Sequence, residues 1–124
     1  MNKKHVPSLE LCQELDRLCK ENNITLPETE FYWNIKNKTL TSKPYRYIHT
    51  TKYSNLPSPL VSEQGEWLPF GYCSMKSGSM FKKASYICGR SENGEGKDCL
   101  ANTEPNARQK MINYLIAEGI ITKL

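Results

Sequence analysis

The last quarter of the chain most constrains the fold, because residues 103–119 carry helix signals at both ends. Thr103 is a favoured N-cap, Pro105 is tolerated in a first helical turn, and Gly119 is typical of the position just past a helix. Apolar side chains recur between these signals at helical spacing, at Ala107, Met111, Tyr114 and Leu115. We therefore predict an amphipathic helix over residues 103–119, with Arg108 projecting from the flank of its packed face.

Length and composition predict a single intracellular domain. The chain has 124 residues, of which 38% are hydrophobic, and no apolar run approaches the roughly 18 residues needed to cross a bilayer. The basic residues at the start, up to His5, are not followed by the apolar core of a signal peptide. The five cysteines form no Cys-x-x-Cys pair, so reduced thiols are expected. We therefore expect the protein in a cytoplasm, with no membrane association.

Periodicity elsewhere predicts one more long helix and two hairpins. Apolar residues at three- and four-residue spacing follow Ser8 and predict a helix from about Ser8 to Glu21. Residues 30–36 and 39–41 fit a first hairpin, since the segment is aromatic and β-branched and is interrupted by Asn37-Lys38. Residues 71–76 and 80–88 fit a second hairpin around the turn Ser77-Gly78-Ser79.

Two further segments complete the predicted fold. Residues 45–53 alternate with a period of two, as a strand does. Residues 56–65 carry a serine, a proline and a closing glycine at the spacing of a short helix. The whole order predicts an α+β domain over residues 1–124, in which an N-terminal, a short central and a C-terminal helix flank one antiparallel sheet of about five strands.

No set of residues forms a convincing catalytic or metal site. Zinc takes four Cys or His ligands, which small domains supply in close pairs; the only set that can be drawn is widely spaced, namely Cys73, Cys88, Cys99 and His49. Buried thiols are the simpler interpretation. A cysteine nucleophile would need His5 or His49 beside it, and His49 fits better as a half-buried imidazole on a strand. We therefore predict no catalytic residues, no metal and no cofactor.

An anion site has two sources in the sequence. The glycine-bearing loop 91–98 follows Arg90 and offers backbone N–H groups, although plain turns are the commoner interpretation of such loops. Aromatic side chains that can stack on a base also occur beside basic side chains that can bind phosphate, although aromatics are equally typical of ordinary sheets. The candidate ligand-binding residues are Arg108, Arg90, Trp67, Tyr72, Trp33, Lys76 and Lys82.

Four blocks of the sequence together resemble small, largely uncharacterised proteins of bacteriophages and prophages. These blocks are residues 6–12, 30–33, 65–72 and 103–111, and they span almost the whole chain. The resemblance implies a small accessory phage protein that acts in the host bacterial cytoplasm. Such proteins often blunt host defence, and some sequester nucleotide-derived immune signals in pockets between subunits. The resemblance supplies no catalytic residues.

The leading hypothesis is a non-enzymatic protein that binds an anionic, nucleotide-like small molecule. Arg108 and Arg90 would contact phosphate, and Tyr72, Trp67 or Trp33 would stack on the base. On this hypothesis, replacing Arg108 by alanine costs ligand affinity and leaves folding nearly intact.

Two other functions remain open. The first alternative is an inhibitor of a host or phage protein, with exposed aromatics as anchors, and the second is a nucleic-acid-binding protein. The net charge of +4, from 17 basic and 13 acidic residues, favours nucleic acid only weakly. A sheet rich in aromatics and covered by three helices also predicts a homodimer or higher homo-oligomer.

Overall fold

The computed structural model describes residues 5–36, 38–42, 55–76, 86–90 and 98–124. The described elements are three helices and six strands, in the order α1 (Leu9–Glu21), β1 (Phe31–Asn34), β2 (Thr39–Ser42), β3 (Asn55–Ser58), α2 (Val61–Trp67), β4 (Tyr72–Lys76), β5 (Tyr86–Arg90), β6 (Cys99–Ala101) and α3 (Glu104–Ala117). The α+β class is therefore confirmed. None of the helices described is long and apolar enough to cross a membrane.

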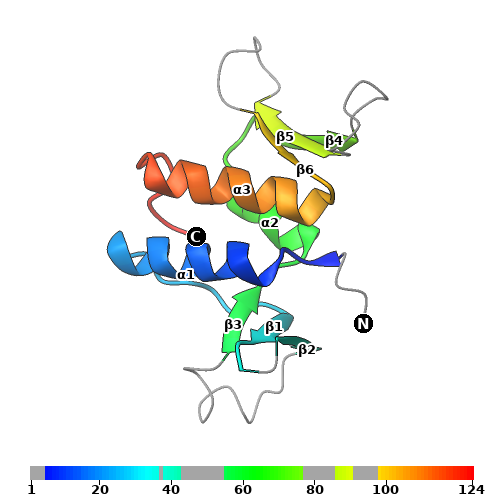
Figure 1. Cartoon of the computed structure of the whole chain (residues 1–124). Helices are drawn as coiled ribbons and strands as arrows, with labels where there is room; N and C mark the ends of the chain where they lie inside the picture. The colour runs from blue at the N-terminus through cyan, green and yellow to red at the C-terminus, as the bar shows by residue number, and fades with distance from the viewer. Residues whose placement is uncertain (1–4, 37, 43–54, 77–85, 91–97) are drawn as a thin grey trace.

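The strands form two antiparallel sheets of three strands each, so the prediction of one sheet of about five strands is wrong. One sheet has the order β2-β1-β3 and the other the order β4-β5-β6. The helices lie between them: Figure 1 shows β4, β5 and β6 beyond α3, and β1, β2 and β3 on the far side of α1. Because the helical layer separates the two predicted hairpins, they cannot join into one sheet.

The first hairpin is confirmed, and the second is confirmed in its pairing. β1 pairs with β2, with Trp33 opposite Leu40. β4 pairs with β5, with Lys76 opposite Tyr86. The expected turn at residues 77–79, the expected strand residues 80–85 and the expected strand 45–53 lie outside the described residues.

The short central helix begins later than predicted. Residues 55–58 form β3, in which Leu56 lies opposite Trp33 on β1 and is buried. Helix α2 then runs from Val61 to Trp67, so Gly65 lies inside the helix and does not close it. A Cβ atom at Gly65 would lie 3.0 Å from Nη1 of Arg108, so a larger residue here would require the guanidinium to shift by a few tenths of an ångström. The three-residue strand β6 was not predicted.

Helices α1 and α3 begin at the predicted N-caps. The Ser8 side chain accepts a hydrogen bond from Leu11 N–H, and the Thr103 side chain accepts one from Asn106 N–H. At the end of α3, Gly119 has a φ of +76°, the left-handed conformation that glycine adopts without a steric penalty. Local capping chemistry therefore determines where both long helices begin and where α3 ends.

The apolar side chains form two clusters that share helix α1. The larger cluster packs α3 against the sheet β4-β5-β6 and against the middle and end of α1, and includes Leu15, Met111, Ile112, Leu115 and Ile116. The smaller cluster packs the start of α1 on the sheet β2-β1-β3, and consists of Val6, Leu9, Cys12, Trp33 and Leu56. The start of α1 is therefore held between the sheet β2-β1-β3 and α3.

A chain of buried amides joins the three helices. Gln64 on α2 donates to Gln109 Oε1 on α3 at 3.1 Å, and Gln109 donates to Asn113 Oδ1 at 2.9 Å. Asn113 in turn donates to the Leu11 carbonyl oxygen on α1 at 3.2 Å. These bonds satisfy polar groups that would be costly to bury unpaired, and they fix α1 and α3 side by side with their N-termini at the same end (Figure 1).

Candidate functional site

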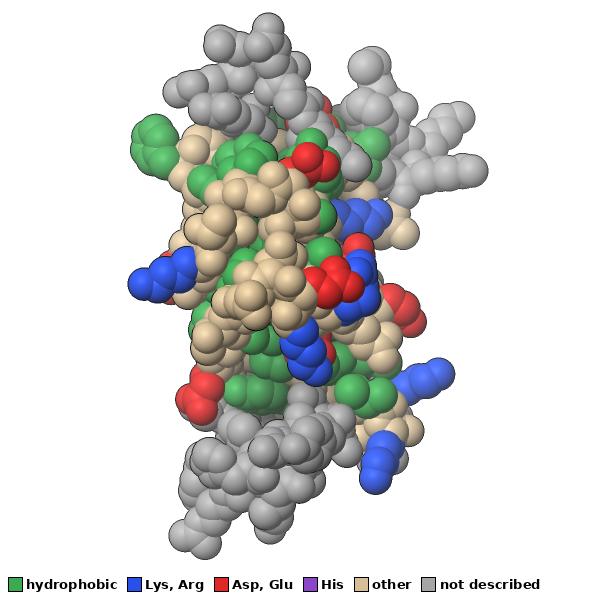
Figure 2. All heavy atoms as spheres, turned by 90° about the vertical axis from the view of Figure 1, so that its left-hand side faces the viewer, with side chains coloured by type: hydrophobic (Ala, Val, Ile, Leu, Met, Phe, Trp, Pro, Cys, Tyr) green, Lys and Arg blue, Asp and Glu red, His purple; other side chains and the backbone are tan. Residues whose placement is uncertain are grey.

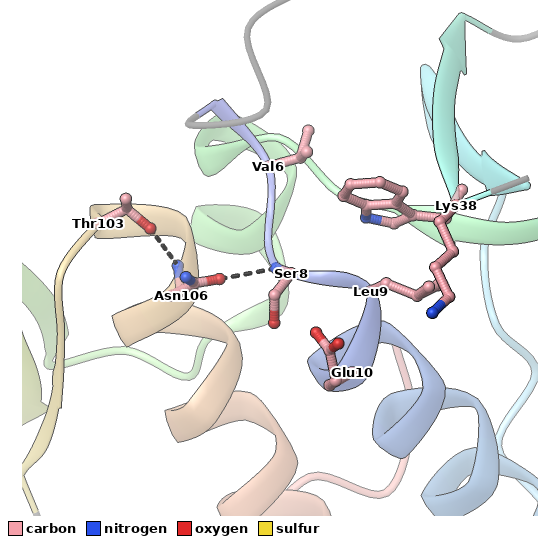
Figure 3. A pocket seen from close by; sticks show the side chains of 8 residues that line it. Val6, Ser8, Leu9, Glu10, Lys38, Thr103 and Asn106 are labelled. Atoms are coloured by element: carbon pink, nitrogen blue, oxygen red, sulfur yellow. Dashed lines mark hydrogen bonds between the residues drawn. The ribbon is translucent and has the colours of Figure 1, made fainter. Parts of the chain in front are cut away.

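A pocket lies where the N-termini of α1 and α3 meet the turn between β1 and β2. Its volume is about 340 Å³, within the range of small-molecule sites. Apolar side chains form one part of its wall, namely Val6, Leu9 and Trp33. Polar and charged side chains form the rest, namely Ser8, Glu10, Lys38, Thr103 and Asn106. We call this cavity the N-terminal pocket (Figure 3).

One hydrogen bond between the two helix starts, together with the N-cap bond of α3, holds the polar wall in place. The Ser8 N–H donates to Asn106 Oδ1 at 2.7 Å, and the Asn106 N–H donates to Thr103 Oγ1 at 3.4 Å (Figure 3). Asn106 therefore accepts one hydrogen bond, from Ser8 of α1, and donates one, to Thr103 of its own helix. The first N–H groups of a helix carry partial positive charge, so this wall presents the positive ends of two long helices.

The apolar wall is almost fully buried. Val6 is 1% exposed and Trp33 is 5% exposed. The indole N–H of Trp33 donates to the Pro7 carbonyl oxygen at 2.9 Å, which fixes the ring under the chain that leads into α1. Trp33 therefore forms a rigid part of the apolar wall, and little of its ring area is available for stacking on a base.

Lys38 and Glu10 bring opposite charges to the same pocket. Both side chains are exposed, and neither takes part in the ion pairs found among the described residues. Lys38 extends from the β1–β2 turn toward the first turn of α1 (Figure 3). A ligand in the pocket can therefore meet an ammonium group and a carboxylate whose charges are not already neutralised by each other.

The backbone at Lys38 is in the left-handed region, with a φ of 54°. Only one other described non-glycine residue has a positive φ, Asn23 at 56°, and asparagine tolerates this region far better than lysine does. The turn thus carries a lysine where asparagine or glycine would be less strained. Strained backbone of this kind often occurs at functional positions.

Arg108, the first of the predicted phosphate ligands, binds neighbouring elements of its own chain. Its Nε donates to Ser74 Oγ on β4 at 2.8 Å, and its Nη1 donates to the Val61 carbonyl oxygen on α2 at 2.7 Å. The Ser74 hydroxyl donates to Glu104 Oε2 at 2.6 Å. The guanidinium therefore connects α3, β4 and α2.

Of the other predicted ligand residues, Trp33 lines the N-terminal pocket, and Trp67 and Tyr72 do not. Trp67 and Tyr72 are half-buried and pack against the larger apolar cluster. Tyr72 lies opposite Arg90 in the β4–β5 register. The side chains of Arg90 and Lys76, and all of Lys82 and of residues 91–97, lie outside what the structure describes. Their assignment as ligand residues stays a prediction.

The expectation of buried thiols is confirmed for Cys88 and Cys99 and is wrong for Cys73, which is exposed. All five are free, and four of them are buried. Burial raises the pKa of Cys12 and of Cys88 to about 12, and in Cys88 the nearby Arg108 partly opposes this effect. Burial also raises the pKa of Cys19 to about 11. Among the residues described, no group of Cys, His, Asp or Glu is placed to hold a metal ion; His49 lies outside them.

Sequence reasoning found the N-caps Ser8 and Thr103 and the turn at Lys38, yet it did not find the pocket that they line. The hydrogen bond from Ser8 to Asn106 spans 98 positions of the chain, so no local pattern reveals it. The only available signal was a lysine in a tight turn where asparagine or glycine is usual.

Comparisons with known proteins add no relative. No family model matches the sequence, no curated protein matches it, and no solved structure matches the fold.

Proposed function

We propose that this chain is a small phage accessory protein that binds an anionic, nucleotide-like molecule in the N-terminal pocket and sequesters it in the host cytoplasm. The observation that carries the proposal is Lys38, which forms no ion pair among the described residues and lines a cavity with a buried apolar wall. An ammonium group supplies the countercharge for a phosphate. The parts of Leu9 and Trp33 that remain exposed, 9% and 5% of these residues, supply a small apolar surface that a base can contact.

The helix starts at the pocket favour the same sign of ligand charge. Helices α1 and α3 have 13 and 14 residues and begin side by side at Ser8 and Thr103. Their N-terminal dipoles attract negative charge. Lys38 and the two helix starts therefore act on an anion in the same direction, and Glu10 opposes them.

The surrounding surface gives room for a ligand of nucleotide size. A neighbouring hollow of about 400 Å³ shares Ser8 and Asn106 with the N-terminal pocket and extends to Lys110. The Lys110 ammonium donates to the Leu100 carbonyl oxygen at 2.8 Å. The neighbouring hollow therefore leaves room for the part of a nucleotide that contacts neither Lys38 nor the apolar wall.

Calorimetric titration with nucleoside monophosphates and cyclic dinucleotides tests the proposal. We expect binding by the wild type and at least about tenfold weaker binding by Lys38→Asn, because one charged hydrogen bond contributes about 1.5–3 kcal/mol. Lys36→Asn is the matched control: Lys36 is exposed at the same turn and does not line the pocket. Equal binding by wild type and Lys38→Asn, or no binding of any nucleotide, would contradict the proposal.

Exposed apolar side chains support a second candidate function, binding of a host or phage protein. Phe70 is 97% exposed in the turn before β4, and Met75 and Leu100 are 59% and 39% exposed. Met75 and Leu100 alternate along their strands with Ser74, which contacts α3, and with buried Cys99, so they lie on the sheet face away from α3. Such a face also suits the proposed homo-oligomer.

Three substitutions distinguish this candidate from the first. If this face binds a host protein, Phe70→Ser and the double variant Met75→Lys Leu100→Lys should abolish capture of that protein. If it forms a homo-oligomer, the same variants should lower the mass measured by light scattering. In both cases nucleotide titration should be unchanged. Capture and mass that are equal in wild type and variants would remove the second candidate.

Nucleic-acid binding has the least support. On the face where α1 and α3 end, Figure 2 shows acidic and basic side chains interspersed. The ion pairs of α1 show the same mixture, since Arg17 lies 2.9 Å from Glu21 and Lys20 lies 2.9 Å from Asp16. A strand of nucleic acid binds best along a continuous basic surface. Binding of a labelled single strand that weakens steeply with salt would favour this function.

A further inference from the structure

We propose that Glu10 makes the N-terminal pocket selective for a guanine base. This inference rests on the proposed function and names the substrate class of the same site. It starts from Lys38 and Glu10, the two charged residues of the pocket, which form no ion pair within the part of the chain that the structure describes. Lys38 can bind the phosphate of a nucleotide. Glu10, on the same pocket, offers a carboxylate to another part of the ligand.

The carboxylate of Glu10 can only accept hydrogen bonds while it is ionised. Figure 3 shows it at the start of α1, on the wall that also carries Ser8 and Leu9. No side chain described in the structure forms an ion pair with it. A ligand that places an acceptor against Glu10 would lose affinity, because the carboxylate would give up water and gain no donor. A ligand group that displaces water from Glu10 therefore binds best when it carries N–H donors.

Among the common bases, guanine fits this requirement best. Its N1–H and its N2 amino group are adjacent donors, so they can donate in parallel to the two oxygens of one carboxylate, as an arginine fork does. Adenine and cytosine each place one donor beside a ring-nitrogen acceptor. Uracil places one N–H between two carbonyl acceptors. Only guanine offers two neighbouring donors and no acceptor between them.

Glu10 also has a purely structural interpretation, which the test must separate from selectivity. An acidic residue in the first turn of a helix stabilises the helix dipole, and Glu10 holds that position in α1. Glu10→Gln removes this charge and replaces the carboxylate by an amide with one acceptor and one donor. Such an amide can accept a hydrogen bond from the N6 amino group of adenine and donate one to its N7. A structural role predicts a small loss of stability and no change in base preference.

The experiment is calorimetric titration of wild type, Glu10→Gln, Glu30→Gln and Lys38→Asn with the four nucleoside monophosphates. For wild type we expect guanosine monophosphate to bind at least about fivefold more tightly than the other three, the lower end of the discrimination that a bidentate base contact provides. Glu10→Gln should lose this preference and favour adenosine monophosphate. Glu30→Gln should behave as wild type, because Glu30 is exposed and does not line the pocket.

The outcomes separate this inference from the function on which it rests. Lys38-dependent binding with equal affinity for all four bases would overturn the role of Glu10 and leave the proposed function standing. A guanine preference that persists in Glu10→Gln would also overturn it. Absence of Lys38-dependent binding would overturn the proposed function, and the role of Glu10 with it.

Discussion

Replacement of Arg108 by alanine should destabilise the fold and leave ligand binding unchanged. The change removes two hydrogen bonds from the guanidinium, one to Ser74 Oγ at 2.8 Å and one to the Val61 carbonyl oxygen at 2.7 Å. It also leaves the Ser74–Glu104 pair without its cation. Three elements therefore lose the side chain that connects them.

The size of the effect follows from these two bonds. A hydrogen bond to a charged group contributes about 1.5–3 kcal/mol. Arg108 is only partly buried, so water replaces some of the lost bonding, and we expect a loss of about 2–4 kcal/mol in the free energy of unfolding. Unfolding entropy is about 2.1 cal/mol/K per residue, or about 0.26 kcal/mol/K for 124 residues. The expected fall in Tm is therefore about 8–15 °C.

Urea and thermal unfolding, followed by circular dichroism, measure the change. Ser74→Ala is the control, because it removes one of the two partners and should cost about half as much. The Arg108→Ala Ser74→Ala double variant should then lose less than the two single losses added together, because the two residues share one bond. A Tm within about 2 °C of wild type, together with lost nucleotide affinity, would refute this account and restore Arg108 as a phosphate ligand.

Three further predictions concern the turn at Lys38 and the cysteines. Lys38→Asn should raise the free energy of unfolding by about 0.5–1 kcal/mol, because asparagine relieves part of the cost of a positive φ; a lowered Tm would contradict the backbone argument. The free energy of unfolding should fall as pH rises from 9 toward 12. Burial raises the pKa values of Cys12, Cys19 and Cys88 from 9.0 to about 12, 11 and 12. The thiols of the unfolded chain therefore ionise at lower pH than those of the folded protein, which favours unfolding. Urea midpoints at about pH 8 and pH 10.5 measure this, and the difference should shrink when Cys12 is replaced by alanine. Ellman's reagent should react rapidly with Cys73 alone in the native protein, since the other four thiols are buried, and rapid modification of a second thiol would show that the described packing opens.

The sequence predicted the features of the fold that local chemistry determines. The N-caps Ser8 and Thr103 and the stop at Gly119 lie where capping preferences placed them, because a cap depends on residues within one turn. The two hairpins also follow from short-range pattern. The pairing of β1 with β3 could not be predicted in this way. Leu56 lies opposite Trp33 in the sheet, but β2 and a long connection separate the two residues in the sequence.

The candidate site depends on tertiary contacts that single-sequence reasoning does not reach. Arg108 looked available because it lies at the edge of the packed face of its helix, yet Ser74 and Val61 come from other elements to bind it. Gly65 looked like a helix stop, and in the structure it makes room for that same guanidinium. Trp33 looked like a stacking surface, and the fold buries it under Pro7.

The most direct test of the central claim is a ¹⁵N–¹H correlation spectrum of the protein titrated with guanosine monophosphate. The amide signals of Ser8, Glu10, Lys38 and Asn106 should shift progressively and saturate together, because all four residues line the N-terminal pocket. The signals of Ser74 and Arg108 should not move. Absence of any saturable shift, or shifts confined to Tyr72, Trp67 and Arg108, would contradict the claim that the N-terminal pocket is the binding site.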